Sequence, residues 1–187
     1  MTATELGPTA IVTGTYNLDP AHTRVGFVAR HAMVTKVRGS FNDVSGTAVL
    51  DAEEPSRSSV EVRIQAGSID TRNADRDNHL RTNDFLDVQT YPEIRFVSTA
   101  VELASPGVYR VTGDLTIKGV TKAVTIDFEH TGTAVDPWGN LRVGFEASAT
   151  INRRDWGVNW NAALEAGGVL VSEKIVLEFE IAAVKAA

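Results

Sequence analysis

The chain has 187 residues, near the usual size of one domain, so we expect a single hydrophobic core. Its 43% of hydrophobic and 22% of charged residues exclude an intrinsically disordered chain. The lack of cysteine excludes disulfides, thiolate catalysis and cysteine-ligated metals, and the formal net charge of -6 argues against nucleic acids and anionic membrane surfaces as the main partners.

Residues 1–15 are expected to form an N-terminal extension that could be flexible, followed by one barrel domain over residues 16–185. The extension carries Glu5, and its only apolar run, residues 10–12, is too short for the core of a signal peptide or for a membrane span. We therefore expect a cytoplasmic protein. Export remains an alternative, because removal of a signal peptide before Met1 would leave the same sequence.

Apolar and polar residues alternate with a period of two along most of the chain, which predicts β-strands with one buried face. In residues 24–32, for example, Val25, Phe27, Ala29 and His31 share one face. We expect at least eight strands, because the same pattern recurs at residues 36–41, 46–51, 60–66, 93–98, 108–117, 121–130, 141–151 and 173–182. A turn is expected at residues 42–46, and another at Gly119.

Residues 71–87 interrupt this alternation and predict one short helix, with Thr71 and Asn73 as candidate N-caps. Consecutive strands with one solvated face favour an antiparallel arrangement, and closure into a barrel removes exposed strand edges. The predicted fold class is therefore all-β: an antiparallel eight-stranded barrel with one short helix.

A barrel of eight strands encloses either a core filled by side chains or room for one small ligand. The predicted inner face combines phenylalanines with small residues, which leave space unless neighbouring side chains fill it. This combination predicts a tunnel, and a filled core remains the alternative at this point. The small residues are Gly39, Ala66, Gly113, Ala147 and Ala149.

Several separated segments together resemble the YceI-like family of polyisoprenoid-binding proteins, over about Tyr16 to Phe179. They are YNLDPAHTRVGFVARH, VRGSF, RDNHLRTNDFLD, YPEIRFVST, VTGDLTIKGVTKAV and NRRDWG. The resemblance implies an extended lipocalin-like barrel with a helix across one end and a pore that holds a long isoprenoid or a similar amphiphile. It also implies that pairing into a homodimer is common and that export is common among relatives. Roles in stress tolerance or in sequestration of lipophilic compounds have been suggested for some of them, and for this chain we expect isoprenoid transport or storage.

The inward-facing pattern and the resemblance together predict the ligand-binding residues. They are Phe27, His31, Phe41, Ile64, Phe96, Leu115, Phe128, Phe145, Trp156, Leu177 and Phe179. The predicted partner is a long-chain isoprenoid or another lipophilic small molecule, with no nucleic acid, no stable membrane insertion and a possible homodimer. We expect no cofactor, no metal and no catalytic residue.

The histidines do not occur in an HxH or HExxH spacing, so a metal site is not indicated. His31 shares the predicted inner face and could donate a hydrogen bond to a ligand head group. No GxSxG elbow is present, so the leading interpretation is non-catalytic binding by a carrier or sequestering protein. Two alternatives remain: an enzyme acting on a lipophilic substrate with His31 as acid or base, and a filled barrel that serves as an interaction module.

The NRRDWG segment carries two further expectations. Arg153 and Asp155 are expected to brace a strand end, although such an arginine could also bind a pyrophosphate head. Trp156 and the nearby Trp160 are expected to form a lid over the barrel or an interface patch.

Overall fold

The structure, a computed structural model, describes residues 10–187, and the first nine residues of the predicted extension lie outside the described part. Eleven strands make up one sheet. The strands are β1 (Gly14–Leu18), β2 (Arg24–His31), β3 (Thr35–Phe41), β4 (Val44–Leu50), β5 (Ser59–Gln65), β6 (Ile69–Asp70), β7 (Glu93–Ser105), β8 (Val108–Ile117), β9 (Val120–Val135), β10 (Leu141–Asn152) and β11 (Lys174–Lys185). The helices are α1 (Ala74–Leu80) and four short 3-10 segments, η1 (Pro20–His22), η2 (Pro55–Arg57), η3 (Ala66–Ser68) and η4 (Arg153–Trp156).

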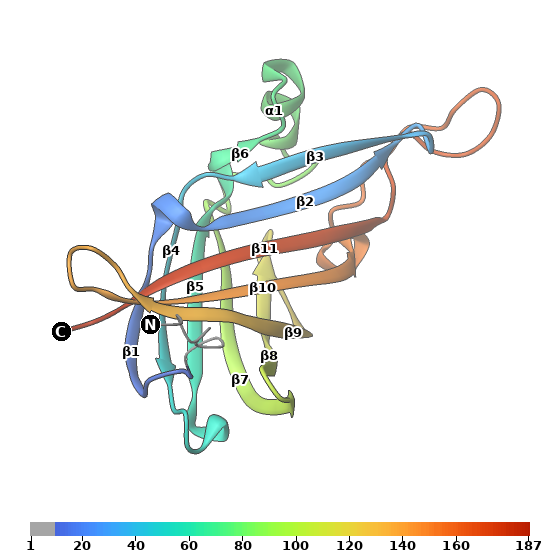
Figure 1. Cartoon of the computed structure of the whole chain (residues 1–187). Helices are drawn as coiled ribbons and strands as arrows, with labels where there is room; N and C mark the ends of the chain where they lie inside the picture. The colour runs from blue at the N-terminus through green and yellow to red at the C-terminus, as the bar shows by residue number, and fades with distance from the viewer. Residues whose placement is uncertain (1–9) are drawn as a thin grey trace.

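The strands close into an antiparallel barrel, as the sequence predicts (Figure 1). The hydrogen-bonded circuit runs β1-β4-β5-β7-β8-β9-β10-β11 and returns to β1, which makes eight strands around the barrel. After η1, β2 continues along the same partner strand, β11, while β3 and the short β6 extend the sheet beyond this circuit. The predicted all-β fold with one short helix is confirmed.

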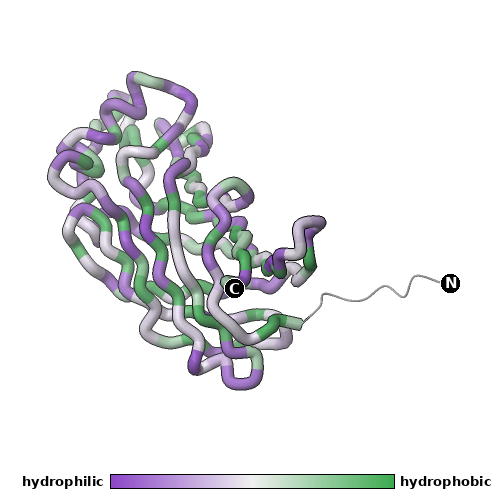
Figure 2. Tube along the Cα trace, turned by 90° about the vertical axis from the view of Figure 1, so that its left-hand side faces the viewer, coloured by the Kyte–Doolittle hydropathy of each residue, from purple (hydrophilic) through white to green (hydrophobic). Residues whose placement is uncertain are grey.

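The period of two in the sequence determines which side chains point inward. Along β8, for example, Val111 and Leu115 are buried whereas Arg110 and Asp114 are exposed. Figure 2 shows hydrophobic and hydrophilic residues alternating along the strands. The apolar faces therefore turn toward one shared interior, because successive side chains of a strand point to opposite sides of the sheet.

The barrel begins before the domain boundary expected at Tyr16. β1 starts at Gly14, and Ile11 is only 9% exposed. Tyr16 is fully buried, and its hydroxyl donates to the carbonyl of Val12 at 2.6 Å. Ile11 thus contributes to the interior of the barrel, and Gly14 and Thr15 belong to its first strand.

The helix predicted within residues 71–87 is α1, which lies at one end of the barrel (Figure 1). Asn73 is its N-cap, and the side-chain oxygen of Asn73 accepts from the Arg76 backbone N–H at 2.9 Å. Thr71 has a different part: its backbone N–H and its hydroxyl both donate to the buried carboxylate of Asp77. This contact anchors α1 to the adjacent β6. No helix in residues 10–187 has the length and apolar character needed to cross a bilayer.

The turn between β8 and β9 also agrees with its sequence. Lys118 and Gly119 both have positive φ, at 50° and 73°, as a two-residue turn between antiparallel strands requires. The Tyr91 ring lies so close to Gly119 that a Cβ there would approach within 2.6 Å of it. Glycine at this position therefore satisfies both the backbone geometry and the packing.

Candidate binding cavity

The interior of the barrel contains an apolar cavity of about 310 Å³. Its lining comes from every strand of the circuit, and also from β2, β3, α1 and the loop that follows α1. The volume lies at the lower end of the range of small-molecule sites in proteins, which is about 300–1,000 Å³. The barrel is therefore not solidly filled, so the cavity agrees with the tunnel that the sequence favours rather than with the filled core.

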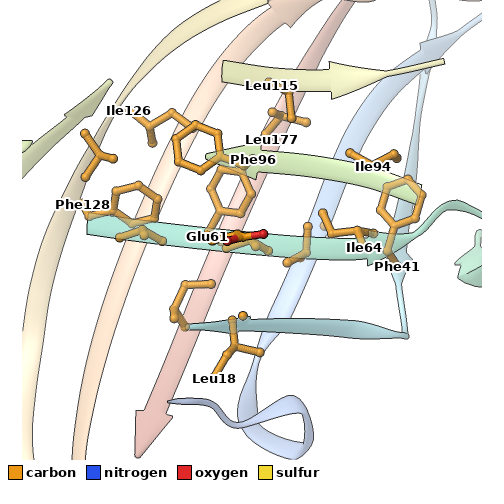
Figure 3. Close-up of a pocket in the computed structure, with 18 of the residues that line it drawn as sticks. Leu18, Phe41, Glu61, Ile64, Ile94, Phe96, Leu115, Ile126, Phe128 and Leu177 are labelled. Carbon is orange, nitrogen blue, oxygen red and sulfur yellow. The ribbon is translucent and has the colours of Figure 1, made fainter. Parts of the chain in front are cut away.

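Ten of the eleven predicted ligand-binding residues line this cavity, and Figure 3 shows several of them pointing into it. Their role as ligand contacts stays a prediction, whereas their position is a property of the structure. They are Phe27, Phe41, Ile64, Phe96, Leu115, Phe128, Phe145, Trp156, Leu177 and Phe179.

His31 is the exception: it does not line the cavity, and its hydrogen bond to a ligand head group stays a prediction. It is the last residue of β2, it is exposed, and it is not among the cavity-lining residues, which on this strand end at Ala29. Its backbone forms bridges to Thr35 and Val171. The parity of His31 along the strand is inward, but it lies beyond Ala29, the last residue of β2 that lines the cavity.

Two of the small inner residues do not leave the space that the sequence suggested. A Cβ on Gly39 would clash with the Phe27 ring, and a Cβ on Gly113 would clash with the Phe96 ring. Each ring therefore covers a glycine on the neighbouring strand. The cavity lies between such packed rings, not over the glycines. Of the other small residues, Ala66 is buried in the core, whereas Ala147 and Ala149 are not cavity-lining residues.

Aromatic pairs shape the remaining space. The ring centroids of Phe27 and Phe41 are 5.7 Å apart, and those of Phe128 and Phe179 are 5.9 Å apart. Both separations lie within the range of favourable tilted ring contacts. Paired aromatic rings therefore form part of the cavity wall, and the atoms that face the interior are mostly carbon.

The helical end of the cavity is lined by residues that the alternation pattern missed. Leu80, Phe85 and Leu86 come from α1 and the loop after it, and all three line the cavity. They lie in a segment without a period of two, so the strand pattern did not include them. The signal that could have found them is an apolar residue in an otherwise charged stretch, RDNHLRTNDFLD.

Trp156 and Trp160 lie at the same end but differ in position. Trp156 is 3% exposed, lines the cavity and donates its indole N–H to the carbonyl of Leu115 at 2.8 Å. Trp160 does not line the cavity, and its ring packs 4.7 Å from His79 and 5.3 Å from Phe85, centroid to centroid. Trp156 thus belongs to the cavity wall, whereas Trp160 packs on the ring of Phe85, and a lid over the barrel or an interface patch stays a prediction.

Arg153 binds the loop that follows η4, and it does so without the predicted contact to Asp155. Its guanidinium is buried and donates to the backbone carbonyls of Val158, Trp160, Val171 and Ser172 at 2.7–3.3 Å. Asp155 is exposed and does not accept from this guanidinium. Burial lowers the pKa of Arg153. Because these carbonyls come from both ends of residues 158–172, the arginine closes this loop against the barrel.

Two tyrosines, Tyr16 and Tyr109, line the cavity. Burial raises the pKa of both Tyr16 and Tyr109 above the usual value of 10.0. Tyr109 also packs edge-on against Phe145, with ring centroids 6.2 Å apart.

In residues 10–187 no group of three or more acidic or histidine side chains is arranged to hold a metal ion. The arrangement is suited to receiving an apolar molecule and offers it little charge.

The closed barrel and its apolar interior define the class of the protein, which is a lipocalin-like barrel with a small-molecule cavity. The model of the YceI-like domain matches residues 16–183. The chain is also 42% identical to a UPF0312 protein of Pseudomonas syringae pv. syringae over 137 residues, which cover 73% of this chain and 71% of the relative. The chain therefore belongs to the YceI-like domain family.

Two solved structures share the fold. BcnA of Burkholderia cenocepacia superposes with a TM-score of 0.78 at 24% identity, over 88% of this chain and 98% of that chain. A polyisoprenoid-binding domain from Saccharophagus degradans, implicated in plant cell wall breakdown, superposes with a TM-score of 0.69 at 14% identity, over 94% of this chain and 100% of that chain. At these identities the similarity establishes the barrel fold and nothing further.

Proposed function

We propose that this protein binds a long apolar amphiphile, a polyisoprenoid, inside the barrel and does not transform it chemically. The observation that carries the proposal is the apolar cavity, whose wall is formed by side chains from all around the barrel. Membership of the YceI-like family supports it, as does the structural neighbour that is described as a polyisoprenoid-binding domain.

The physical basis of this binding is the removal of apolar surface from water. Burial of a hydrocarbon chain contributes about 0.8 kcal/mol per methylene before the costs of ordering the ligand. Because the hydrophobic effect has no preferred direction, the wall accepts tails of different structure. The length of the cavity and the groups near its ends then determine which ligand is preferred.

The non-catalytic part of the proposal is supported by the position of the one acid-base candidate. An enzyme using His31 would need this side chain within hydrogen-bond reach of the substrate. His31 is exposed and does not line the cavity. The observed volume likewise favours a carrier over a filled barrel that serves as an interaction module.

The test is organic extraction of the purified protein followed by mass spectrometry. We expect one long-chain isoprenoid lipid per chain, unchanged after prolonged incubation of the protein. A protein that contains no lipid and takes up no added polyprenol would overturn the proposal. Conversion of bound lipid to a new product during incubation would support the enzymatic alternative instead.

Carriage or sequestration of this lipid in the cytoplasm is the physiological role that we propose for the chain. A role in lipid storage under stress and pairing into a homodimer belong to the same proposal. Sedimentation velocity of the full chain measures the oligomeric state directly, and a single species with the mass of one chain would contradict the homodimer.

A further inference from the structure

The turn between β2 and β3 carries exposed apolar side chains at one end of the molecule. Met33 is 64% exposed and Val34 is 73% exposed, and Val169 in the loop before β11 is 38% exposed. The Ala32 backbone N–H donates to the carbonyl of Leu170 at 2.7 Å, which joins the turn to this loop. Figure 1 shows the two segments together beyond one end of the barrel. We call Met33, Val34 and Val169 the apolar tip.

The requirements of folding do not explain this turn. Ala32 and Met33 have φ values of 50° and 62°, a conformation that asparagine, aspartate and glycine adopt at lower cost. A turn made of alanine and methionine is therefore both strained and more apolar than the hairpin needs. Backbone strain combined with exposed apolar side chains indicates a functional site.

Unpaired cations lie directly behind the apolar tip. Arg30 on β2 and Lys36 on β3 are opposite each other in the antiparallel register, and Arg38 follows on the same face of β3. Like charges in opposite positions destabilise a sheet. Within residues 10–187 none of these three side chains forms an ion pair. The Arg30 guanidinium donates to the Val34 carbonyl at 3.3 Å, so its charge stays beside the turn, and the described hairpin concentrates positive charge without an acidic partner.

The sequence shows the same local asymmetry. Residues 20–41 contain no aspartate or glutamate, although the whole chain has a net charge of -6. Salt at physiological strength screens exposed charges beyond about 8 Å, so a surface that approaches the hairpin interacts mainly with its local positive charge. The one acidic residue of the adjoining loop between Trp160 and Val171 is Glu165.

The apolar tip lies at an end of the cavity. Ala29 and Val171 both line the cavity, and the bridge between His31 and Val171 leads from them to the turn. The apolar tip thus lies only a few residues along the chain from two residues that line the cavity.

We propose that the apolar tip docks on the surface of an anionic lipid bilayer, where Met33, Val34 and Val169 enter the interface and Arg30, Lys36 and Arg38 contact lipid phosphates. Such a bilayer is complementary to this surface, because its negatively charged head groups match the cations and its apolar layer matches the apolar tip. A second copy of the chain fits less well, because a two-fold pair through the tip would bring the two sets of cations together. The inference goes beyond the cavity ligand, since docking is measured without any ligand in the barrel.

The test is flotation of the full chain with vesicles of phosphatidylcholine and phosphatidylglycerol, compared with vesicles of phosphatidylcholine alone. We expect binding to the anionic vesicles that weakens as salt is added. The M33S/V34S double variant should bind roughly tenfold more weakly, because it loses apolar contact with the interface. The R30Q/K36Q/R38Q variant should bind roughly 100-fold more weakly, about fivefold for each charge removed.

The control is Trp138→Ser, which removes an 82% exposed side chain from the β9–β10 turn. In Figure 1 this turn projects at the opposite side of the molecule from the β2–β3 turn. The control should bind vesicles like the unmodified chain. Equal loss of binding in Trp138→Ser and M33S/V34S would overturn the proposal, and so would failure of the unmodified chain to float with anionic vesicles. A dimer that depends on Met33 and Val34, without vesicle binding, would assign the tip to a second copy and reject the bilayer.

Two further measurements separate this inference from the proposed function. Circular dichroism verifies that each variant is folded, and extraction with mass spectrometry measures the lipid in its cavity. Because Met33 and Val34 do not line the cavity, M33S/V34S should keep that lipid while losing vesicle binding. A variant that keeps both would contradict the docking surface, whereas a chain that binds vesicles without ever holding lipid would contradict the cavity proposal alone.

Discussion

A substitution at Leu115 tests most directly whether the cavity holds the lipid tail. Leu115 is 8% exposed, projects from β8 into the cavity and lies opposite Phe96 on the neighbouring strand. We expect Leu115→Trp to lower lipid retention at least about tenfold, because the indole occupies space the tail needs, at a stability cost of about 1–3 kcal/mol. Asp114→Trp is the matched control, since Asp114 is the next residue along β8 and is exposed. Quantitative extraction measures both, and equal lipid content in the two variants would contradict the cavity assignment.

Among the carboxyl groups, we expect Asp136 to have the largest effect on how the free energy of unfolding depends on acidic pH. Its carboxylate accepts from Arg142 at 2.7 Å and from the backbone N–H groups of Trp138 and Asn140, and these contacts lower its pKa from 3.8 to about 2. Because the folded pKa lies below the unfolded one, this stabilisation is complete above about pH 3.8 and is lost as the pH falls through about 2. Urea titrations across this range should show a smaller pH dependence for Asp136→Asn than for the unmodified chain. Glu165→Gln, in an exposed loop, is the control and should keep the original profile.

At the scale of elements, Arg153 is the side chain that bonds to both ends of the loop between η4 and β11, and the Asn161 side chain adds two bonds to Val171 within it. Arg153 donates to four backbone carbonyls, and its removal takes this donor from each of them, including the buried bond to the Val158 carbonyl. We expect Arg153→Met to reduce the free energy of unfolding by at least about 3 kcal/mol and to expose residues 157–173 to proteases. Arg154→Met is the control, because Arg154 is exposed and pairs only with Glu173 on the surface. Similar proteolysis of the two variants would show that Arg153 does not hold the loop.

The elements also show what local patterns can and cannot predict. The Asn73 cap of α1 and all of the strands except β1 and the short β6 follow from neighbouring residues alone, so the sequence predicted them. The contact of Phe27 with Gly39 joins two strands, and the sequence pattern did not indicate which small residue a ring would cover. The repulsive pairing of Arg30 with Lys36 likewise depends on strand register.

At the scale of the whole molecule, the occupied cavity should affect global stability. A ligand that binds only the folded state stabilises it by about 2.7 kcal/mol when its concentration is 100 times its Kd. For a chain of this size that corresponds to a Tm increase of about 5–10 °C. Calorimetry of delipidated and polyprenol-reloaded protein measures the shift. An identical Tm for the two preparations would indicate that the cavity does not take up the lipid.

The sequence by itself determined the all-β class, the inward and outward faces of most strands, the short helix and ten of the residues that surround the cavity. These depend on a period of two and on local capping, which a linear pattern contains. Only the tertiary structure decided where each inward face lies along the barrel. It placed His31 beyond the cavity and brought Leu80, Phe85 and Leu86 from α1 and its loop to the cavity's end. The physical reason is that the stagger and register of the strands are set by closure of the whole barrel, and not by any one segment.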